Sequence, residues 1–200
     1  MDFSGKSTIV NEIADKYPQK FIKQEKMISP QKANLWWQKV LAIKRTIDAS
    51  VIWNAEQKRE YWELVYKAVK YDIEHITPQN TNVVQDSVYM IKSLSKNIQK
   101  NEMGELLDDY KNLVPMLPEM QSVYLTTTPE ERLKRLEARK GTGFKLSLTD
   151  ALLQRDFDRF LDLNEIYKAQ IQQRYPETIV VDTTNATPRE TVTSILDRVI

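Results

Sequence analysis

The run Ser4-Gly5-Lys6-Ser7-Thr8 combines the residue types that bind a polyphosphate chain. Apolar residues follow it at helical spacing, so we expect the run to open a helix whose first backbone amides point toward an anion. The lysine adds a point charge, and the Ser7 hydroxyl can hold Mg²⁺. The pattern predicts a phosphate-binding loop with a nucleoside triphosphate as its ligand. The alternative is a helix that merely begins at Ser4-Gly5 and carries an exposed lysine.

The complete pattern of such a loop is G-x-x-x-x-G-K-[ST], and a buried strand normally precedes it. Its first glycine would stand immediately before Met1, so the sequence begins inside the pattern. We expect either that the natural start lies upstream of Met1 or that the protein has lost this strand.

Two carboxylates end apolar segments that read as strands. Glu25 ends the segment 20–25, and Asp86 ends the segment 82–86. In open α/β sheets ligands bind beyond the C-terminal ends of the strands, so both side chains are site candidates, with Asp86 near Mg²⁺ or the substrate. The alternative for both is ordinary solvated surface charge.

A basic helix follows the third apolar segment. Thr128-Pro129-Glu130-Glu131 is a typical helix start, and Arg132, Arg135 and Arg139 then share one helical face before Gly141-Thr142-Gly143. This arrangement predicts a lid over about 130–147, whose guanidinium groups neutralise charge that develops during phosphoryl transfer. A solvated basic helix with ion pairs to neighbouring glutamates is the alternative.

Helices alternate with four short apolar segments along the chain. We expect strands at 20–25, 82–86, 122–126 and 178–182. We expect helices at 4–17, 30–47, 56–76, 87–100, 105–113, 129–140, 148–175 (long or kinked) and from Pro188 onward. This order predicts an α/β fold, a parallel sheet between two helical layers, as one domain over 1–200. A fifth strand would precede Met1.

Composition excludes several classes of protein. The 29 basic and 28 acidic residues leave a net charge of +1, which argues against a general nucleic-acid binder. The chain has no cysteine and one histidine, so neither a thiolate site nor a histidine cluster can be assembled. No apolar run approaches the length of a membrane span, and the start does not resemble a secretion signal, so we expect neither. We therefore expect a cytoplasmic protein without membrane partners.

Four tryptophans fall in the first third of the chain, at 36, 37, 53 and 62. Most tryptophans pack helices together, but one or two aromatic side chains could line a pocket and stack on a base. Trp36 and Trp37 are adjacent on a helix and cannot both face the same pocket.

The order of these parts resembles the thymidylate kinase and deoxynucleoside kinase group of P-loop kinases. The resemblance rests on Asp2 to Thr8, on Val83-Val84-Gln85-Asp86-Ser87, and on Val123-Tyr124-Leu125 leading into the 129–135 helix start. The ending, from Tyr167 to Tyr175 and from Ile179 to Val192, also looks like that group. The resemblance spans nearly the whole chain, although only the loop motif is specific.

The resemblance implies transfer of the ATP γ-phosphoryl group, with Mg²⁺, to a nucleoside monophosphate, with dTMP as the first candidate. It implies a nucleotide-binding loop made by Asp2, Phe3, Ser4, Gly5, Lys6, Ser7 and Thr8. Lys6 would contact the β- and γ-phosphates, Ser7 and Asp86 the metal, and Thr8 the α-phosphate.

The same resemblance gives roles to residues outside the loop. Arg135 and Arg139 match lid arginines, and Asn185 and Thr187 lie where the family binds adenine. Asp2, Glu25 and Asp86 would lie near the acceptor, together with the aromatic candidates Trp36 and Tyr66; Glu25 would be the general base in the nucleoside-kinase branch. A homodimer is also expected, with the aromatic helices near Trp36 or Trp62 as candidate interface.

Two departures keep other functions open. The family carries an arginine after its third strand where Ser87 stands, and another on the preceding helix where Val65 and Tyr66 stand. Each charge-assisted hydrogen bond to an acceptor phosphate is worth about 1.5–3 kcal/mol. A deoxynucleoside kinase, which takes a neutral acceptor, and a kinase-like nucleotide-binding protein with lost catalysis are therefore the alternatives.

Overall fold

The computed structural model describes residues 5–24, 27, 33–46, 53–75, 82–140 and 148–199. The chain divides into two compact units. Unit 1 comprises Met1–Lys23, Thr81–Asp86 and Glu119–Ile200, and unit 2 comprises Gln24–Asn80 and Ser87–Pro118. Asp2, Phe3, Ser4 and Glu25, which the sequence analysis assigned to the site, lie outside the described residues.

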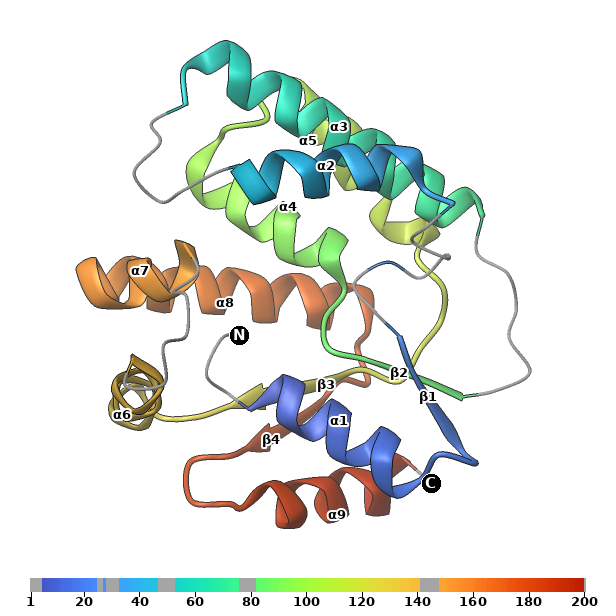
Figure 1. Cartoon of the computed structure of the whole chain (residues 1–200), viewed down its shortest axis with the longest axis vertical. Helices are drawn as coiled ribbons and strands as arrows, with labels where there is room; N and C mark the ends of the chain where they lie inside the picture. The colour runs from blue at the N-terminus through green and yellow to red at the C-terminus, as the bar shows by residue number, and fades with distance from the viewer. Residues whose placement is uncertain are drawn as a thin grey trace. The chain divides into compact units, whose positions relative to one another are not determined.

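Unit 1 holds the strands and the helices that pack on them (Figure 1). Its strands are β1 (Phe21–Gln24, whose last residue opens unit 2), β2 (Asn82–Gln85), β3 (Val123–Thr126) and β4 (Ile179–Asp182). Its helices are α1 (Lys6–Lys16), α6 (Pro129–Lys140), α7 (Leu148–Arg155), α8 (Phe157–Arg174) and α9 (Pro188–Val199). All four strands therefore form where apolar segments predicted them.

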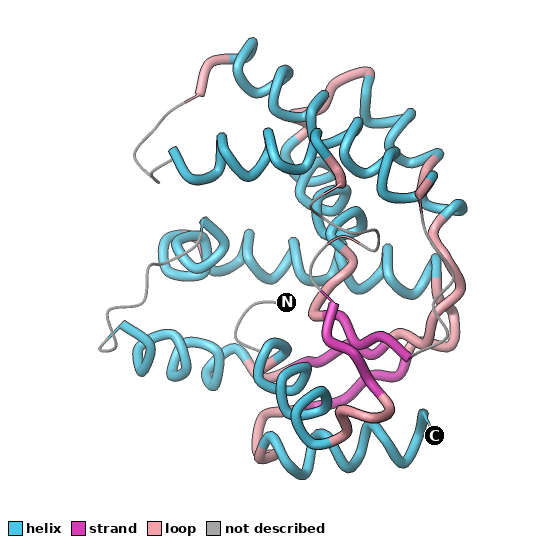
Figure 2. The backbone as a smooth tube through the Cα atoms, turned by 45° about the vertical axis from the view of Figure 1, so that its right-hand side comes forward, coloured by secondary structure: helices cyan, strands magenta, loops and turns pink. Residues whose placement is uncertain are grey.

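The strands form two pairs, drawn in magenta in Figure 2. β3 and β4 run parallel, in a register that sets Val123 opposite Ile179 and Thr126 opposite Asp182. β1 pairs with β2, and within the described residues the two pairs are not hydrogen-bonded to each other. Because β3 and β4 are parallel, their C-terminal ends deliver the loops after Thr126 and Asp182 to the same edge.

The strands lie between two layers of helices. On one face, α1 and α9 pack against β3 and β4 in one apolar cluster of Ile9, Ile13, Leu125, Val181, Val192 and Ile195. On the other face, the Tyr124 ring lies 6.1 Å from the Tyr167 ring of α8, and its hydroxyl donates to the Asn164 carbonyl at 3.4 Å. Leu125 and Tyr124 are consecutive and so point to opposite faces, which produces the predicted three layers.

Unit 1 departs from the prediction in the segment 148–175. This segment forms two helices rather than one, because Asp156 caps the second by accepting a hydrogen bond from the Arg159 amide at 3.1 Å. α6, α7 and α8 are joined by a second apolar cluster around the buried Leu136, Leu153 and Phe160. The middle of α6 is thus part of the core of unit 1.

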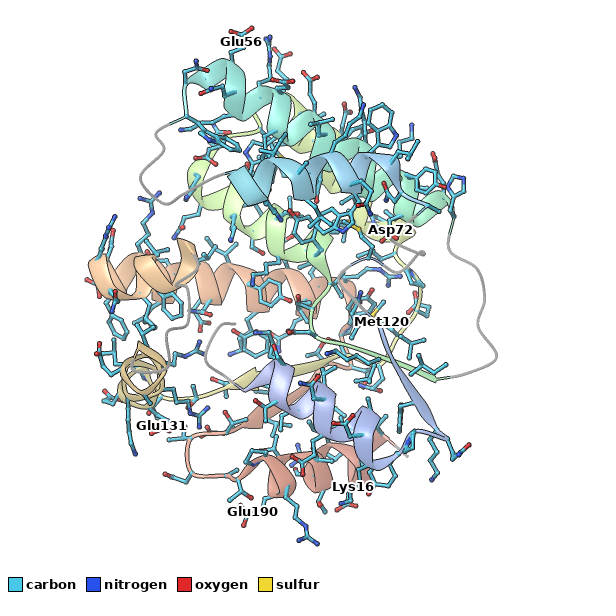
Figure 3. The ribbon with its side chains drawn as sticks, in the orientation of Figure 1. Lys16, Glu56, Asp72, Met120, Glu131 and Glu190 are labelled. Atoms are coloured by element: carbon cyan, nitrogen blue, oxygen red, sulfur yellow. The ribbon has the colours of Figure 1, made fainter. Side chains whose placement is uncertain are left out.

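Unit 2 is helical. Its elements are α2 (Leu35–Thr46), α3 (Ala55–Glu74), α4 (Tyr89–Lys100), α5 (Leu106–Asn112) and the 3-10 turn η1 (Val114–Met116). α2 begins after Asn34, whose side chain accepts from the Trp37 amide at 2.9 Å; the start of the helix predicted over 30–47 lies outside the described residues. Asn54 and Gln57 form a capping box at the start of α3, the helix that carries Glu56 and Asp72 in Figure 3.

Two tryptophans of unit 2 serve the packing role expected of most of them. Trp37 is 1% exposed and meets the Tyr89 ring edge-on at 4.7 Å, and Trp62 is also buried. Trp36 is only partly buried, as its position next to Trp37 on a helix requires. None of the helices in the described part of the chain is both long and apolar enough to cross a bilayer.

Candidate phosphate-binding site

The candidate site begins at Gly5, the residue that precedes α1. Gly5 has φ 87° and ψ 7°, in the left-handed region that favours glycine. Its carbonyl accepts the first hydrogen bond of the helix, from the Ile9 amide at 3.0 Å. No side chain caps the described start of α1, and its first turn carries no acidic residue. The first amides of α1 can therefore receive an anion.

Asp86 brings the end of β2 to the first turn of α1. The Ser7 hydroxyl donates a hydrogen bond to Asp86 Oδ2 at 2.5 Å. Lys6 Nζ lies 3.9 Å from Asp86 Oδ1, and the two side chains are 17% and 33% exposed. Residues 79 positions apart thus form one cluster of a lysine, a hydroxyl and a carboxylate, which we call the Lys6–Ser7–Asp86 cluster. The resemblance implies one site for all three residues, and their side chains lie in contact.

This cluster suits a metal ion that arrives with a polyphosphate. Mg²⁺ prefers oxygen ligands and usually takes one or two protein carboxylates together with substrate phosphates and water. Ser7 and Asp86 supply a hydroxyl and a carboxylate side by side. The described residues contain no group of three or more acidic or histidine side chains that could hold a metal by themselves. The residues present therefore fit Mg²⁺ bound jointly with phosphate.

The basic face of α6 divides into two environments. Arg132 is buried, where its Nε donates to the Thr127 carbonyl at 3.3 Å and its guanidinium lies 5.5 Å from the Phe160 ring. Arg135 instead bonds Glu131 at 2.9 Å and the Thr183 carbonyl at 2.6 Å. The side chain of Arg139 is outside the described residues. Arg132 is therefore buried, whereas Arg135 is partly exposed and bound to Glu131 and to the loop after β4.

The loop after β4 carries the two residues predicted to bind the donor base. Asn185 is exposed. Thr187 caps α9: its amide and hydroxyl both donate to Glu190 Oε2 at 2.8 Å, and its hydroxyl accepts from the Glu190 amide at 3.3 Å. These bonds hold the pKa of Glu190, labelled in Figure 3, below its usual value. Both residues are exposed, but the Thr187 side chain is bound to Glu190.

The acceptor candidates Trp36 and Tyr66 belong to unit 2. The ammonium groups of Lys39 and Lys67 lie 4.8 Å and 5.2 Å from the Trp36 ring centroid. The Tyr66 ring lies 6.4 Å from that of Tyr110. These contacts give Trp36 a cationic surrounding within unit 2 and leave Tyr66 packed against α5.

Unit 2 also contains a polar aromatic cluster that the sequence analysis did not single out. Lys44 Nζ donates to the Tyr89 hydroxyl at 2.8 Å and lies over the rings of Tyr89 and Trp37, at 4.4 Å and 5.0 Å. The Tyr61 hydroxyl is 3.5 Å from that of Tyr89. Burial, followed by the proximity of Tyr61, raises the pKa of Tyr89 well above its usual value. The spacing of Trp37 and Lys44, two turns apart on α2, was the one available signal.

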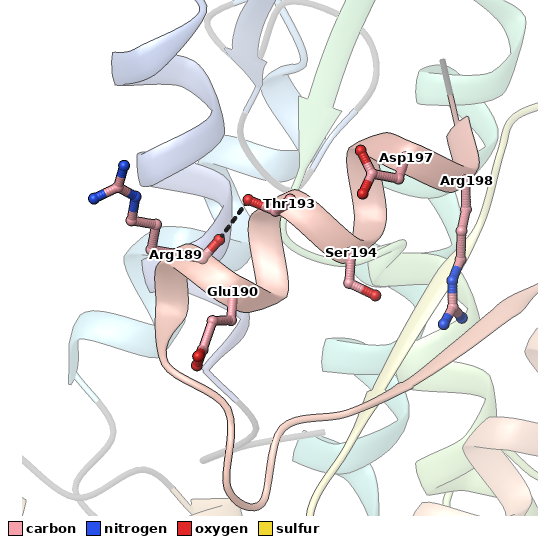
Figure 4. A pocket seen from close by; sticks show the side chains of 6 residues that line it. All are labelled: Arg189, Glu190, Thr193, Ser194, Asp197 and Arg198. Atoms are coloured by element: carbon pink, nitrogen blue, oxygen red, sulfur yellow. Dashed lines mark hydrogen bonds between the residues drawn. The ribbon is translucent and has the colours of Figure 1, made fainter.

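A surface hollow on α9 is not the site. Arg189, Glu190, Thr193, Ser194, Asp197 and Arg198 line it (Figure 4). All six belong to one helix, so the hollow has a single wall, and the Thr193 hydroxyl donates within that helix to the Arg189 carbonyl at 3.1 Å. None of these residues carries a predicted role.

Comparison with solved structures defines the fold. The chain superposes on the thymidylate kinase of Candida albicans with a TM-score of 0.65 and 17% identity, over 100% of this chain and 87% of that one. It also superposes on the deoxyadenosine kinase of M. mycoides with bound dCTP, with a TM-score of 0.54 and 16% identity, over 98% and 93% of the two chains. A second structure of that kinase, with dCMP and dCDP as products, gives 0.51. The chain has the α/β P-loop fold of these kinases.

Sequence comparison does not assign the chain to a family. No family model matches the chain, and no curated protein matches it.

Proposed function

We propose that this protein transfers the γ-phosphoryl group of ATP to a nucleoside monophosphate, in the manner of a thymidylate kinase. The observation that carries the proposal is the Lys6–Ser7–Asp86 cluster at an uncapped helix start. Phosphoryl transfer asks a protein mainly to position two substrates and to stabilise charge on the phosphates. A left-handed glycine, the first backbone amides of α1, an ammonium group and a hydroxyl–carboxylate pair supply these functions.

Each group of the cluster has a defined task in this proposal. The first amides of α1 bind phosphate oxygens, and Lys6 leaves Asp86 to contact the β- and γ-phosphates. Ser7 and Asp86 hold Mg²⁺, which neutralises charge on the phosphates. Thr8 binds the α-phosphate. Asp2, Glu25 and Arg139 keep the roles that the resemblance implies, as parts of the same proposal.

The acceptor is proposed to be dTMP first and a deoxynucleoside second. The thymidylate kinase of C. albicans, whose structure is described as revealing the origin of broad substrate specificity, supports the first choice. The similar fold of a deoxyadenosine kinase, together with Ser87, Val65 and Tyr66 where acceptor arginines were expected, supports the second.

A panel of acceptors tests the proposal. The purified protein is incubated with ATP and Mg²⁺ and with dTMP, dUMP, thymidine, deoxyadenosine or deoxycytidine, and products are separated by chromatography. A monophosphate converted to its diphosphate supports the first choice, and a nucleoside converted to its monophosphate supports the deoxynucleoside kinase. Calorimetric binding of ATP–Mg²⁺ without any product would instead indicate a kinase-like nucleotide-binding protein.

A further inference from the structure

Arg135 is bound on both sides by groups of unit 1. Its Nε donates to Glu131 Oε1 at 2.9 Å, one turn earlier on α6. Its Nη2 donates to the Thr183 carbonyl at 2.6 Å, and its Nη1 to Thr183 Oγ1 at 3.3 Å. All three guanidinium nitrogens thus make hydrogen bonds, and two of them reach a residue 48 positions away.

Thr183 is the point at which the loop after β4 is attached to the sheet. It is 4% exposed, and both its amide and its hydroxyl donate to the Thr126 carbonyl, at 2.9 Å and 3.0 Å. Thr126 is the last residue of β3, so Thr183 joins the two parallel strands where they end. Arg135 of α6 donates hydrogen bonds to Thr183 and so ties α6 to the ends of these strands.

The next residue, Thr184, extends the same junction. Its hydroxyl and amide donate to Asp182 Oδ1 at 2.6 Å and 2.9 Å, and its hydroxyl accepts from the Thr128 amide at 3.0 Å. These bonds from Thr184 and the nearby positive charge of Arg135 lower the pKa of Asp182. The turn 182–184 is therefore held by β3, by the start of α6 and by Arg135, and Asn185 follows it directly.

We propose that Arg135 is a positioning residue: it holds the turn 182–184 so that Asn185 meets the base of the donor nucleotide, and it thereby sets donor affinity and base selectivity. This inference rests on the proposed function, because it takes the 183–187 loop as the donor-base loop. It differs from the lid role that the resemblance implies, in which the arginine charge acts on the phosphate being transferred. The guanidinium fork carries the effect, since a lysine cannot donate two hydrogen bonds to one residue from a planar group.

Kinetics on three variants separate positioning from charge. We expect Arg135→Ala to raise KM for ATP about tenfold or more and to change kcat less than about twofold, because it removes charge-assisted bonds that act on binding. Arg135→Lys should behave like Arg135→Ala, and the preference for ATP over GTP should shrink in both. Lys134→Ala, which removes a neighbouring charge from an 80% exposed side chain of the same helix, is the matched control and should behave as the wild type.

Hydrogen exchange supplies a readout that does not need activity. Without nucleotide, we expect faster exchange in Arg135→Ala and Arg135→Lys at the amides of Thr183, Thr184 and Thr187, and no change in Lys134→Ala. Unchanged exchange in both arginine variants overturns the inference. A fall in kcat that lysine restores also overturns it, because it would place the charge on the reacting phosphate. If Arg135→Ala does not fold, Arg135→Lys decides the question.

The failure of the proposed function gives a different result. A wild-type protein without phosphoryl transfer to any acceptor removes the kinase proposal, while exchange and calorimetric ATP affinity of the variants still decide whether Arg135 positions the loop. Faster hydrogen exchange in the Arg135 variants combined with unchanged ATP affinity contradicts the inference about Arg135 and leaves the kinase proposal intact.

Discussion

Ser7 and Lys6 both contact Asp86, but the Ser7 contact is much the shorter. The Ser7–Asp86 hydrogen bond is 2.5 Å long, whereas the Lys6–Asp86 separation is 3.9 Å, the long end for an ion pair. A partly exposed pair at this distance contributes little to stability. Lys6 can therefore exchange Asp86 for a phosphate at low cost, while Ser7 and Asp86 remain together as the proposed site for a divalent cation.

Replacement of Lys6 should separate fold from activity. We expect Lys6→Ala to lower phosphoryl transfer by on the order of 10²-fold or more, because it removes charge-assisted bonds to two phosphates. The free energy of unfolding should change by less than about 0.5 kcal/mol, the usual range away from core features. Steady-state rates and denaturant titration measure the two quantities. Lys16→Ala, on the exposed last turn of the same helix, is the control, and retained turnover in Lys6→Ala would remove the assignment.

Gly5 should matter for stability and for binding, and another glycine separates the two effects. A Cβ at Gly5 meets nothing within 4 Å, so the cost of Gly5→Ala comes from its positive φ, about 1 kcal/mol. Gly104 also has a positive φ and open surroundings, so Gly104→Ala should cost a similar amount in denaturant titration. Only Gly5→Ala should weaken ATP binding in calorimetry. Equal affinity in the two variants would exclude Gly5 from the phosphate site.

The sequence predicted which residues belong to the candidate site better than it predicted the contacts that they make. Strand-end reasoning brought Asp86 to Lys6 and Ser7, because a short apolar segment ending in a carboxylate is a local signal. The contacts of Arg132 and of Lys44 were beyond local reasoning. Arg132 is buried because a carbonyl and an aromatic ring accept its guanidinium, and Tyr89 lies 45 positions from Lys44. Such pairs are decided by tertiary packing.

At the scale of elements, helix starts were predicted where proline or capping residues mark them. α6 begins at Pro129 and α9 at Pro188, as expected. The segment 148–175 was predicted as one long or kinked helix, and the place of its break could not be predicted because Asp156 interrupts it without a proline or glycine. The Asp156 side chain accepts a hydrogen bond from a backbone amide and so caps a new helix. An aspartate within a helical segment takes this role only where tertiary packing favours a helix start there.

The cap of α9 gives a pH-dependent element. The Glu190 carboxylate accepts from the amide and hydroxyl of Thr187, and these bonds depress its folded pKa below the usual 4.5. A carboxyl group whose pKa is lower in the folded state stabilises the fold at pH values above its unfolded pKa. This stabilisation is lost as the pH falls through the folded pKa. We therefore expect the wild type to lose more stability than Glu190→Gln between neutral pH and pH values below 4.5.

Thermal unfolding across this pH range measures the difference between the two proteins. Thr187→Ala should reduce stability by about 1 kcal/mol at neutral pH, because it removes the N-cap of α9. Glu177→Gln, an exposed change before β4, serves as the control. Parallel pH profiles of the wild type and Glu190→Gln would contradict the assignment.

At the scale of the whole molecule, the order of helices and strands predicted the layers but not the units. Alternation of apolar strands and helices suffices for an α/β arrangement, and the superposition on two kinase structures agrees with it. The division into two units depends on which helices of the middle segments pack together, as α2 and α3 do. The apolar face of a helix does not specify which other helix it packs against, so local sequence patterns do not predict this division.

Ligand-induced stabilisation tests the molecule as one system. A nucleotide that binds the folded chain at 100 times its Kd raises the free energy of unfolding by about 2.7 kcal/mol. For a chain of this size, such a change corresponds to a rise in Tm of roughly 5–10 °C. We expect this rise with ATP and Mg²⁺ together and a smaller one with ATP alone, because Ser7 and Asp86 are proposed to hold the metal jointly with phosphate.

Variants assign the thermal shift to the cluster. Lys6→Ala should lose most of the rise, and Asp86→Asn should lose chiefly the part that depends on Mg²⁺, since it removes one charge and keeps an oxygen for Ser7. Lys16→Ala should keep the whole rise. If the wild type shows no shift with any nucleoside triphosphate, nothing binds at the start of α1, and the kinase proposal fails together with the role of Asn185.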